Sequence, residues 1–339
     1  MKILFIEPCF INFGGYYRAL NICKGLARNG LKVDLLVTSN QKFFLKIKKT
    51  TPEPNLTIYE MPRFTVNFYI NGRIFRGIIS LFIALFGKYD IIHAAMPMQF
   101  ESNIPAILLK PFGKKIVMDW DEIFEDTFPP IFPIKQYIQF CEHILPRFFP
   151  NYCVTSDVLK KIVKKRGAQN VVKIINGVDF SEFNPKNKIT YRQKLGLETK
   201  TKYLFAYGNT FAANRPYRFL KTFEYIVKLD PSIKLLCNFN PDEIYQRDHL
   251  QGRIDPKIFA NIINLGYISN KEYLYTADAA LFLSGDGIRE QANYPIRIGS
   301  YIGSNLVIAI NDGRSEASDS LKRFNCAIMS PNLKKLASS

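Results

Sequence analysis

The chain has 339 residues, of which 47% are hydrophobic and 22% are charged. This composition excludes an intrinsically disordered chain, and the length suits two domains of about 150 residues each. The net charge of +17 favours anionic partners, but no run of Lys and Arg is interleaved with aromatic residues, so we do not expect a nucleic-acid partner.

The first half of the sequence alternates short apolar runs with segments of helical spacing. The run KILFIE at 2–7 predicts a first strand, and Gly14-Gly15 break the chain before a helical pattern over 17–29. The run KVDLLVTS at 32–39 predicts the next strand, which completes a right-handed βαβ unit with a parallel sheet. Later strands are predicted over 89–95, 114–120 and 151–156.

The segment 78–87 (IISLFIALFG) is apolar and is flanked by Arg73, Arg76 and Lys88. A helix packed on the sheet is one interpretation. A basic, apolar surface helix that lies on an anionic membrane is the other. The segment is about half as long as a membrane-spanning helix, and we expect no spanning segment in the chain.

The second half repeats the alternation after the region 171–188, where we place the domain hinge. A helix is predicted over about 217–228, and strands are predicted over 201–208, 232–239, 261–268, 278–285 and 305–311, with a late strand over 326–329. We therefore expect two parallel-sheet domains, 1–180 and 181–339, with a ligand crevice between them.

The six cysteines are scattered and form no Cys-x-x-Cys pair. This spacing argues against both a metal site and a disulfide framework. Reduced thiols in a cytoplasmic protein are therefore expected.

The glycine pair Gly14-Gly15 follows the first predicted strand and opens the first predicted helix. Glycines there allow backbone N–H groups to approach an anionic ligand, although a plain tight turn explains them as well. The loop is not a G-x-G-x-x-G motif and no acidic residue follows at the ribose position, which argues against a dehydrogenase.

Polar side chains also follow two other predicted strands. His93 lies near the end of 89–95, where a lone histidine is more often a structural hydrogen-bonding group. Asp119, Asp121 and Glu122 lie at the end of 114–120. They could bind acceptor hydroxyls or manage protons, or they could form a solvated helix N-terminus.

The string Ile174-Ile175-Asn176-Gly177-Val178-Asp179, followed by Phe183 and Pro185, resembles the signature I-P-N-G-V-D-x-x-x-F-x-P of family 4 glycosyltransferases. Further stretches resemble the same family in the same order, namely 14–39, 154–167, 204–220, 265–285 and 294–309. The resemblance implies a GT-B fold, with two Rossmann-like domains that face each other across a cleft.

The same resemblance implies a retaining, metal-independent glycosyltransferase of the hexosyltransferase type. It would move sugar from a UDP- or GDP-linked donor to a glycan or lipid-linked acceptor in surface polysaccharide synthesis, without a further cofactor. Catalytic positions fall on His93 and Asp121, and acceptor-binding positions fall on Asp119 and Glu122. Donor-binding positions fall on Gly14, Gly15, Asn209, Arg215, Arg297 and Ser300. The implied location is the cytoplasm, peripheral on the inner face of the membrane.

The sequence departs from the family pattern at the donor positions. Ser300 stands where the family has a ribose-binding glutamate, Ala292 stands where it has a sugar-binding one, and Glu290 is out of register. Arg215 and Arg297 stand in for lysines and suit a diphosphate. Relatives also continue with further C-terminal helices, so we expect weak activity or none from this chain alone. The alternatives are a non-catalytic partner of an active transferase and a sugar-nucleotide epimerase of the same fold.

Overall fold

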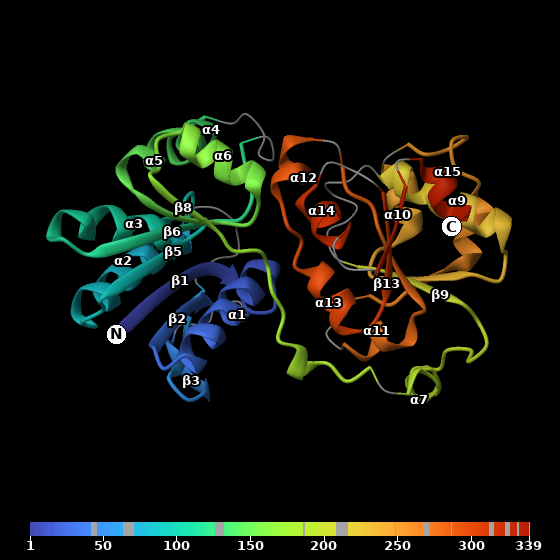
Figure 1. The fold of residues 1–339 in the computed structure, drawn as a ribbon, viewed down its shortest axis with the longest axis horizontal. Coiled ribbons are helices and arrows are strands. Elements are labelled where there is room, and N and C mark those ends of the chain that lie inside the picture. The colour runs from blue at the N-terminus through green and yellow to red at the C-terminus, as the bar shows by residue number, and fades with distance from the viewer. Residues whose placement is uncertain are drawn as a thin grey trace. The chain divides into compact units, whose positions relative to one another are not determined.

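The computed structural model describes most of the chain in two compact units. Unit 1 consists of Met1–Gly177 and Ala292–Ile296, and unit 2 consists of Val178–Gln291 and Arg297–Ser339. Strands and helices alternate along both (Figure 1). The described residues are 1–41, 46–63, 71–125, 132–185, 187–207, 216–247, 249–266, 271–285, 287–311, 315–322, 326–330 and 332–338.

Unit 1 is built on an eight-stranded sheet with the order β3-β4-β2-β1-β5-β6-β7-β8. The strands are β1 Lys2–Phe10, β2 Lys32–Thr38, β3 Lys48–Glu53, β4 Leu56–Met61, β5 Ile91–Ala95, β6 Lys115–Trp120, β7 Asn151–Val154 and β8 Asn170–Lys173. The β3–β4 pair is antiparallel and the other pairs are parallel. Without the edge strand β3, the order has the form 3-2-1-4-5-6-7, which extends the Rossmann order.

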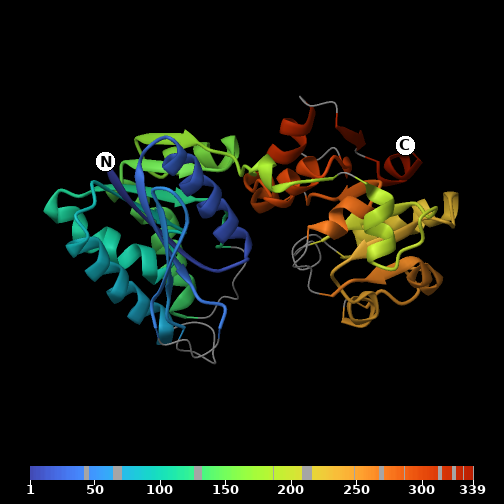
Figure 2. The same ribbon diagram turned by 90° about the horizontal axis from the view of Figure 1, so that it is seen from below.

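Helices cover both faces of this sheet (Figure 2). They are α1 Gly14–Arg28, α2 Asn71–Phe86, α3 Phe100–Leu109, the 3-10 turn η1 Lys110–Phe112, α4 Ile134–Gln139, the π-helical turn η2 Phe140–Ile144, α5 Leu145–Phe148 and α6 Asp157–Lys165. Gly30, with φ of 82°, follows the end of α1. The Ser156 hydroxyl accepts a hydrogen bond from Leu159 N at the start of α6, as an N-cap serine does.

The core of unit 1 lies on both faces of its sheet. Leu4 and Ile6 of β1 belong to one apolar cluster, whereas Phe5 belongs to another with Ala19 and Cys23 of α1. Successive side chains of a strand point to opposite faces, so a parallel sheet covered on both sides needs an unbroken apolar run. Residues 3–6 (ILFI) supply it, and Glu7, which follows them, is also buried.

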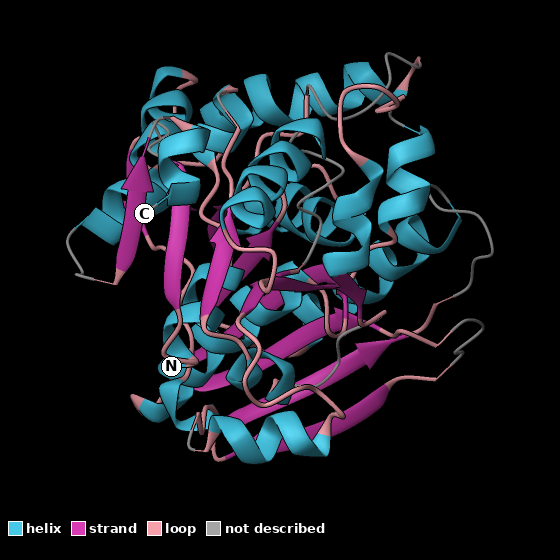
Figure 3. Cartoon of the chain, turned by 90° about the vertical axis from the view of Figure 1, so that its right-hand side faces the viewer, coloured by secondary structure: helices cyan, strands magenta, loops and turns pink. Residues whose placement is uncertain are grey.

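Unit 2 is built on a six-stranded parallel sheet with the order β11-β10-β9-β12-β13-β14, which is the Rossmann order 3-2-1-4-5-6. Figure 3 draws the strands of the chain in magenta and its helices in cyan. The strands are β9 Tyr203–Ala206, β10 Lys234–Cys237, β11 Ile262–Asn264, β12 Ala279–Phe282, β13 Val307–Asn311 and β14 Ala327–Ser330. The helical elements are η3 Phe180–Glu182, α7 Lys188–Lys194, α9 Pro216–Leu229, α10 Pro241–Arg247, η4 Pro256–Asn261, α11 Glu272–Thr276, α12 Ile288–Ala292, α13 Arg297–Gly303, α14 Glu316–Lys322 and α15 Leu333–Ser338.

In helix α2, Arg76 does not have the surface position that the membrane interpretation of segment 78–87 gave it. Arg76 is not a surface cation, because it is 3% exposed and its guanidinium donates to the Glu101 carboxylate of α3 at 2.7 and 3.0 Å. Gly77 lets α2 approach α3 closely, since a Cβ there would lie 2.8 Å from the Phe100 carbonyl oxygen. One face of α2 is therefore packed on α3. No helix in the described ranges is both long enough and apolar enough to span a bilayer.

Candidate active site

The candidate site in unit 1 is centred on Asp119, the penultimate residue of β6. Its side chain is 2% exposed. It accepts hydrogen bonds from Arg18 Nε and Nη2 at 2.8–3.2 Å and contacts His93 Nε2 at 3.1 Å. Burial alone would raise the pKa of this carboxyl, but the charge of Arg18 and the hydrogen bonds outweigh it and lower the pKa to about 2. Asp119 is thus an ionised acceptor whose oxygens are already engaged.

His93, on β5, is held from two sides. Its ring stacks on Phe5 of β1 with the ring centroids 4.1 Å apart. Because Asp119 is ionised and can only accept, the Nε2 atom of His93 must carry the proton that lies between them. The pair therefore fixes the His93 tautomer, as a carboxylate partner does in catalytic and metal-bound histidines.

Arg18 connects this cluster to the signature string. It lies on α1 with 4% exposure, and its Nη1 donates to the Ile174 carbonyl oxygen and to Asn176 Oδ1, both at 2.9 Å. Asn176 Nδ2 in turn donates to the Tyr294 carbonyl oxygen at 2.5 Å. The first half of the signature is therefore held within unit 1 by a buried guanidinium.

The second half of the signature packs within unit 2. A Cβ on Gly299 of α13 would lie 2.5 Å from Val178 Cγ1, and a Cβ on Gly303 would lie 2.9 Å from the Phe183 ring. The two glycines are four residues apart and share one face of α13. The apolar positions of the signature are thus explained by close packing on this helix.

Asp121 and Glu7 are the two carboxyl groups of unit 1 whose pKa values rise most clearly. Burial raises the pKa of Asp121 to about 7, opposed by Arg18 and aided by the charges of Glu122 and Asp119. Its Oδ1 is buried and has no hydrogen-bond partner among the described residues. Burial and then the charge of Asp121 raise the pKa of Glu7 to about 8. Both groups therefore hold protons near neutral pH, as catalytic carboxyl groups often do.

The glycine pair at the start of α1 has two different roles. A Cβ on Gly15 would lie 2.7 Å from Cys9 Sγ and 3.1 Å from Glu7 Oε1, so a larger residue would push the helix off β1. Nothing lies within 4 Å of the corresponding position on Gly14. Gly15 is needed for packing, while the space beside Gly14 is open to a ligand.

The acidic string after β6 is anchored through its backbone. Trp120 Nε1 donates to the Glu122 carbonyl oxygen at 2.6 Å, and Thr155 Oγ1 donates to the Asp121 carbonyl oxygen at 2.9 Å. Trp120 itself is fully buried. The position of Asp121 and Glu122 is therefore set by the core of unit 1.

In unit 2, Arg297 and Ser300 share helix α13. Arg297 Nη1 donates to the Tyr207 carbonyl oxygen at 2.9 Å, and its guanidinium lies 5.1 Å from the Phe282 ring centroid. Ser300 forms a hydrogen bond with the Tyr207 hydroxyl. Both residues are half-buried. Asn209 and Arg215 lie outside the described residues.

The structure gathers His93, Asp119, Asp121 and Gly15 around the ends of β1, β5 and β6, and it places Arg297 and Ser300 together on α13. Sequence reasoning missed Glu7 and Arg18. Each left a signal, since Glu7 is a charge that ends an apolar run and Arg18 precedes Ala19 on the buried side of α1.

In the described ranges, no group of three or more His, Cys, Asp or Glu side chains is placed to hold a metal ion.

No protein-family model matches the sequence, and no curated protein sequence matches it. Solved protein structures do match the fold of this chain. Sucrose-phosphate synthase from Thermosynechococcus elongatus is 12% identical, with a TM-score of 0.73 over 100% of this chain and 88% of that one. WaaG, a glycosyltransferase involved in lipopolysaccharide biosynthesis, is 13% identical, with a TM-score of 0.65 over 99% and 88%. Anabaena HepE, solved with UDP-glucose, is 13% identical, with a TM-score of 0.64 over 100% and 88%.

At these identities the likeness concerns the fold. It extends over the whole chain and is matched by the two mostly parallel sheets with Rossmann strand order. The chain therefore has the GT-B fold of these glycosyltransferases.

Proposed function

We propose that the chain is a glycosyltransferase that moves a sugar from a UDP- or GDP-linked donor to a glycan or lipid-linked acceptor, with retention of configuration. The observation that carries the proposal is the full-length likeness to GT-B glycosyltransferases, one of them solved with UDP-glucose. Two further observations support it, namely a half-buried arginine at the start of α13 and a cluster of carboxyl groups at the end of β6.

The donor site is proposed on unit 2, around Arg297 and Ser300. Departure of a nucleoside diphosphate develops negative charge on its phosphates, and a positioned guanidinium stabilises that charge. Arginine can also bind phosphate oxygens in a bidentate manner. Arg215 and Asn209 complete the donor site on the basis of the sequence resemblance.

The acceptor site is proposed on unit 1, at Asp121 and Glu122. The buried Asp121 Oδ1 lacks a hydrogen-bond donor among the described residues, and an acceptor hydroxyl would supply one. His93 and Asp119 would act beside it. Because both Asp119 oxygens already accept from Arg18, with His93 on one of them, we assign Asp119 a positioning role that fixes His93.

An anionic membrane surface is proposed as the place where a lipid-linked acceptor is met. Helix α2 exposes large apolar side chains on the face that is not packed on α3. These are Ile74, Phe75, Ile78, Phe82, Leu85 and Phe86, each 40–72% exposed. Lys88 follows the helix, and the net charge of +17 complements anionic lipid. Arg76 has no part in this surface.

The proposal is tested by titrating the full chain with UDP and GDP in a calorimeter and then assaying turnover of nucleotide sugars. Ser300, which stands where related enzymes would have a ribose-binding glutamate, favours one alternative, a chain that binds nucleotide sugar without turning it over. Binding without turnover would support that alternative. Release of free nucleotide without any acceptor would support an epimerase-like activity.

A further inference from the structure

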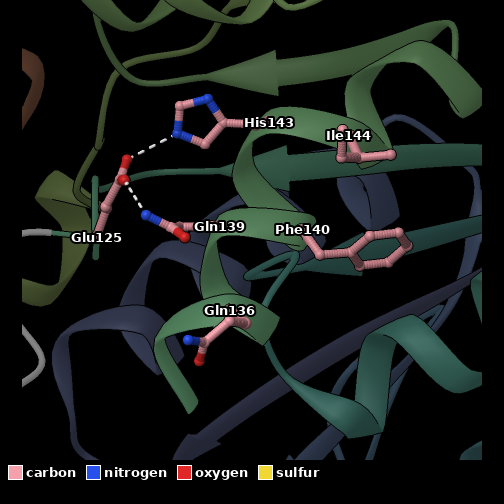
Figure 4. Close-up of a pocket in the computed structure, with 6 residues that line it drawn as sticks. All are labelled: Glu125, Gln136, Gln139, Phe140, His143 and Ile144. Carbon is pink, nitrogen blue, oxygen red and sulfur yellow. Dashed lines mark hydrogen bonds and ion pairs between the residues drawn. The ribbon is translucent and has the colours of Figure 1, made fainter. Parts of the chain in front are cut away.

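A surface hollow of about 420 Å³ lies on unit 1 and belongs to none of the sites described so far. Its volume is within the range of small-molecule pockets, roughly 300–1,000 Å³. It is lined by Glu125 from the segment after β6 and by five residues from α4 and η2, namely Gln136, Gln139, Phe140, His143 and Ile144 (Figure 4).

The polar groups of this hollow are arranged around Glu125. Its carboxylate accepts from Gln139 Nε2 at 2.9 Å and is 2.7 Å from His143 Nε2. The hydrogen bond from His143, and then that from Gln139, lower the pKa of Glu125, so this carboxyl is ionised at neutral pH. Gln136 is exposed, and no hydrogen bond of its side chain appears among the described residues.

The wall of the hollow contains two features that are unfavourable for stability, a π-helical turn and a buried glutamate. Phe140–Ile144 form a π-helical turn, which is rare and frequently occurs at functional sites. Glu142 within it is fully buried, and its Oε1 accepts from Phe124 N at 2.7 Å. Its Oε2 has no hydrogen bond in the described part of the chain and lies 3.7 Å from Arg166 Nη1. Glu142 therefore holds the backbone next to Glu125, and this buried carboxylate is only partly compensated.

We propose that this hollow binds a neutral sugar ring. A sugar carries hydroxyls that both donate and accept around its rim, and the amides of Gln136 and Gln139 with the Glu125 carboxylate offer both kinds of partner. The Phe140 ring, 42% exposed, offers an apolar surface for the C–H face of the ring.

Charge argues for a neutral ligand over a phosphate or carboxylate. Glu125 is ionised, and the nearest guanidinium, that of Arg166, is already paired with residues of the lining, since its Nη2 lies 4.0 Å from Glu125 Oε2 and 3.3 Å from His143 Nε2. Arg166 Nη1 donates to the Glu142 carbonyl oxygen at 3.2 Å, and its guanidinium lies 5.5 Å from the Trp120 ring centroid. The hollow would be a subsite for the saccharide part of the acceptor, and this assignment rests on the proposed function.

The test is saturation-transfer NMR on the full chain with methyl glycosides of glucose, galactose, mannose and N-acetylglucosamine. At least one glycoside should receive saturation, and Gln136→Ala should weaken its binding, and with it that signal, about twofold to tenfold, as expected for loss of one polar contact. Glu125→Gln should reduce it too. Lys135→Ala, one residue earlier on α4 but outside the hollow, should leave it unchanged.

Gln136 is exposed, so its replacement should not disturb folding even if Glu125→Gln does. No saturation of any glycoside, an unchanged signal in Gln136→Ala, or displacement by inorganic phosphate would each overturn the inference. Titration with UDP and GDP separates the two proposals. Nucleotide binding without glycoside binding overturns only the sugar subsite, whereas glycoside binding that depends on Gln136, without nucleotide binding, overturns only the transferase.

Discussion

Arg18 and Asp119 form a buried ion pair, 4% and 2% exposed, with the closest nitrogen and oxygen 2.8 Å apart. The pair joins α1 to β6, and through Asn176 it also holds the signature string. Removal of one partner leaves a buried charge without compensation, which costs more than the pair itself contributes.

Arg18→Ala should therefore lower the free energy of unfolding of unit 1 by about 3–5 kcal/mol. Trp120 is the single tryptophan of the chain and is fully buried in unit 1, so its fluorescence during urea denaturation reports on this unit. Arg28→Ala is the matched control on the same helix. Its pair with Glu53 is half exposed, and its loss should cost at most about 1 kcal/mol. Equal losses in both variants would refute the role of Arg18.

The glycine pair gives a second prediction. Gly15→Ala should lower stability by about 1–3 kcal/mol because its Cβ would meet Cys9 Sγ at 2.7 Å. Gly14→Ala should be neutral or stabilise by up to about 1 kcal/mol, since the new Cβ meets nothing and alanine is the better helix former. Trp120 fluorescence measures both. If Gly14→Ala also loses donor turnover, a ligand approaches this backbone.

The raised pKa values of Glu7 and Asp121 predict a pH dependence. Their folded pKa values of about 8 and about 7 exceed the ordinary values of 4.5 and 3.8, so the folded state binds more protons between these limits. Their contribution to stability is therefore fully present below about pH 4 and is lost as the pH rises toward about 8.

Glu7→Gln removes one of these groups and should gain stability relative to the parent as the pH rises from 5.5 to 8.5, at about 1.4 kcal/mol for each unit of pKa shift. Urea denaturation at several pH values measures the difference. A difference between Glu7→Gln and the parent that stays constant with pH would show that Glu7 keeps an ordinary pKa.

The apolar face of α2 predicts binding to anionic vesicles. Phe82→Asp should reduce flotation with vesicles of phosphatidylcholine and phosphatidylglycerol about tenfold or more, because a large apolar side chain is worth about 1.5–3 kcal/mol when buried. Leu229→Asp, at a 62% exposed position on α9 of unit 2, should have no effect. Equal flotation with pure phosphatidylcholine, or an unchanged Phe82→Asp variant, would contradict the proposal.

Much of the fold was predictable because parallel strands buried on both faces leave short apolar runs, as at 3–6 (ILFI) and 35–37 (LLV). The edge strand β3 was not, because its first five residues are exposed and carry no apolar pattern. In the site, polar residues at strand ends pointed to His93 and Asp119. The engagement of Asp119 by Arg18 depends on a long-range contact between α1 and β6, which local sequence does not encode. The burial of Arg76 was missed for the same reason, since its partner Glu101 lies 25 residues away.

The measurement that tests the central proposal most directly is calorimetric titration of the full chain and of Arg297→Ala with UDP and with GDP. The parent should bind one of the two. Arg297→Ala should bind it more weakly by about 1.5–3 kcal/mol, the range for hydrogen bonds to charged groups. Absence of binding by the parent to either nucleotide would contradict a nucleotide-sugar transferase, and equal affinity in Arg297→Ala would contradict the donor site on α13.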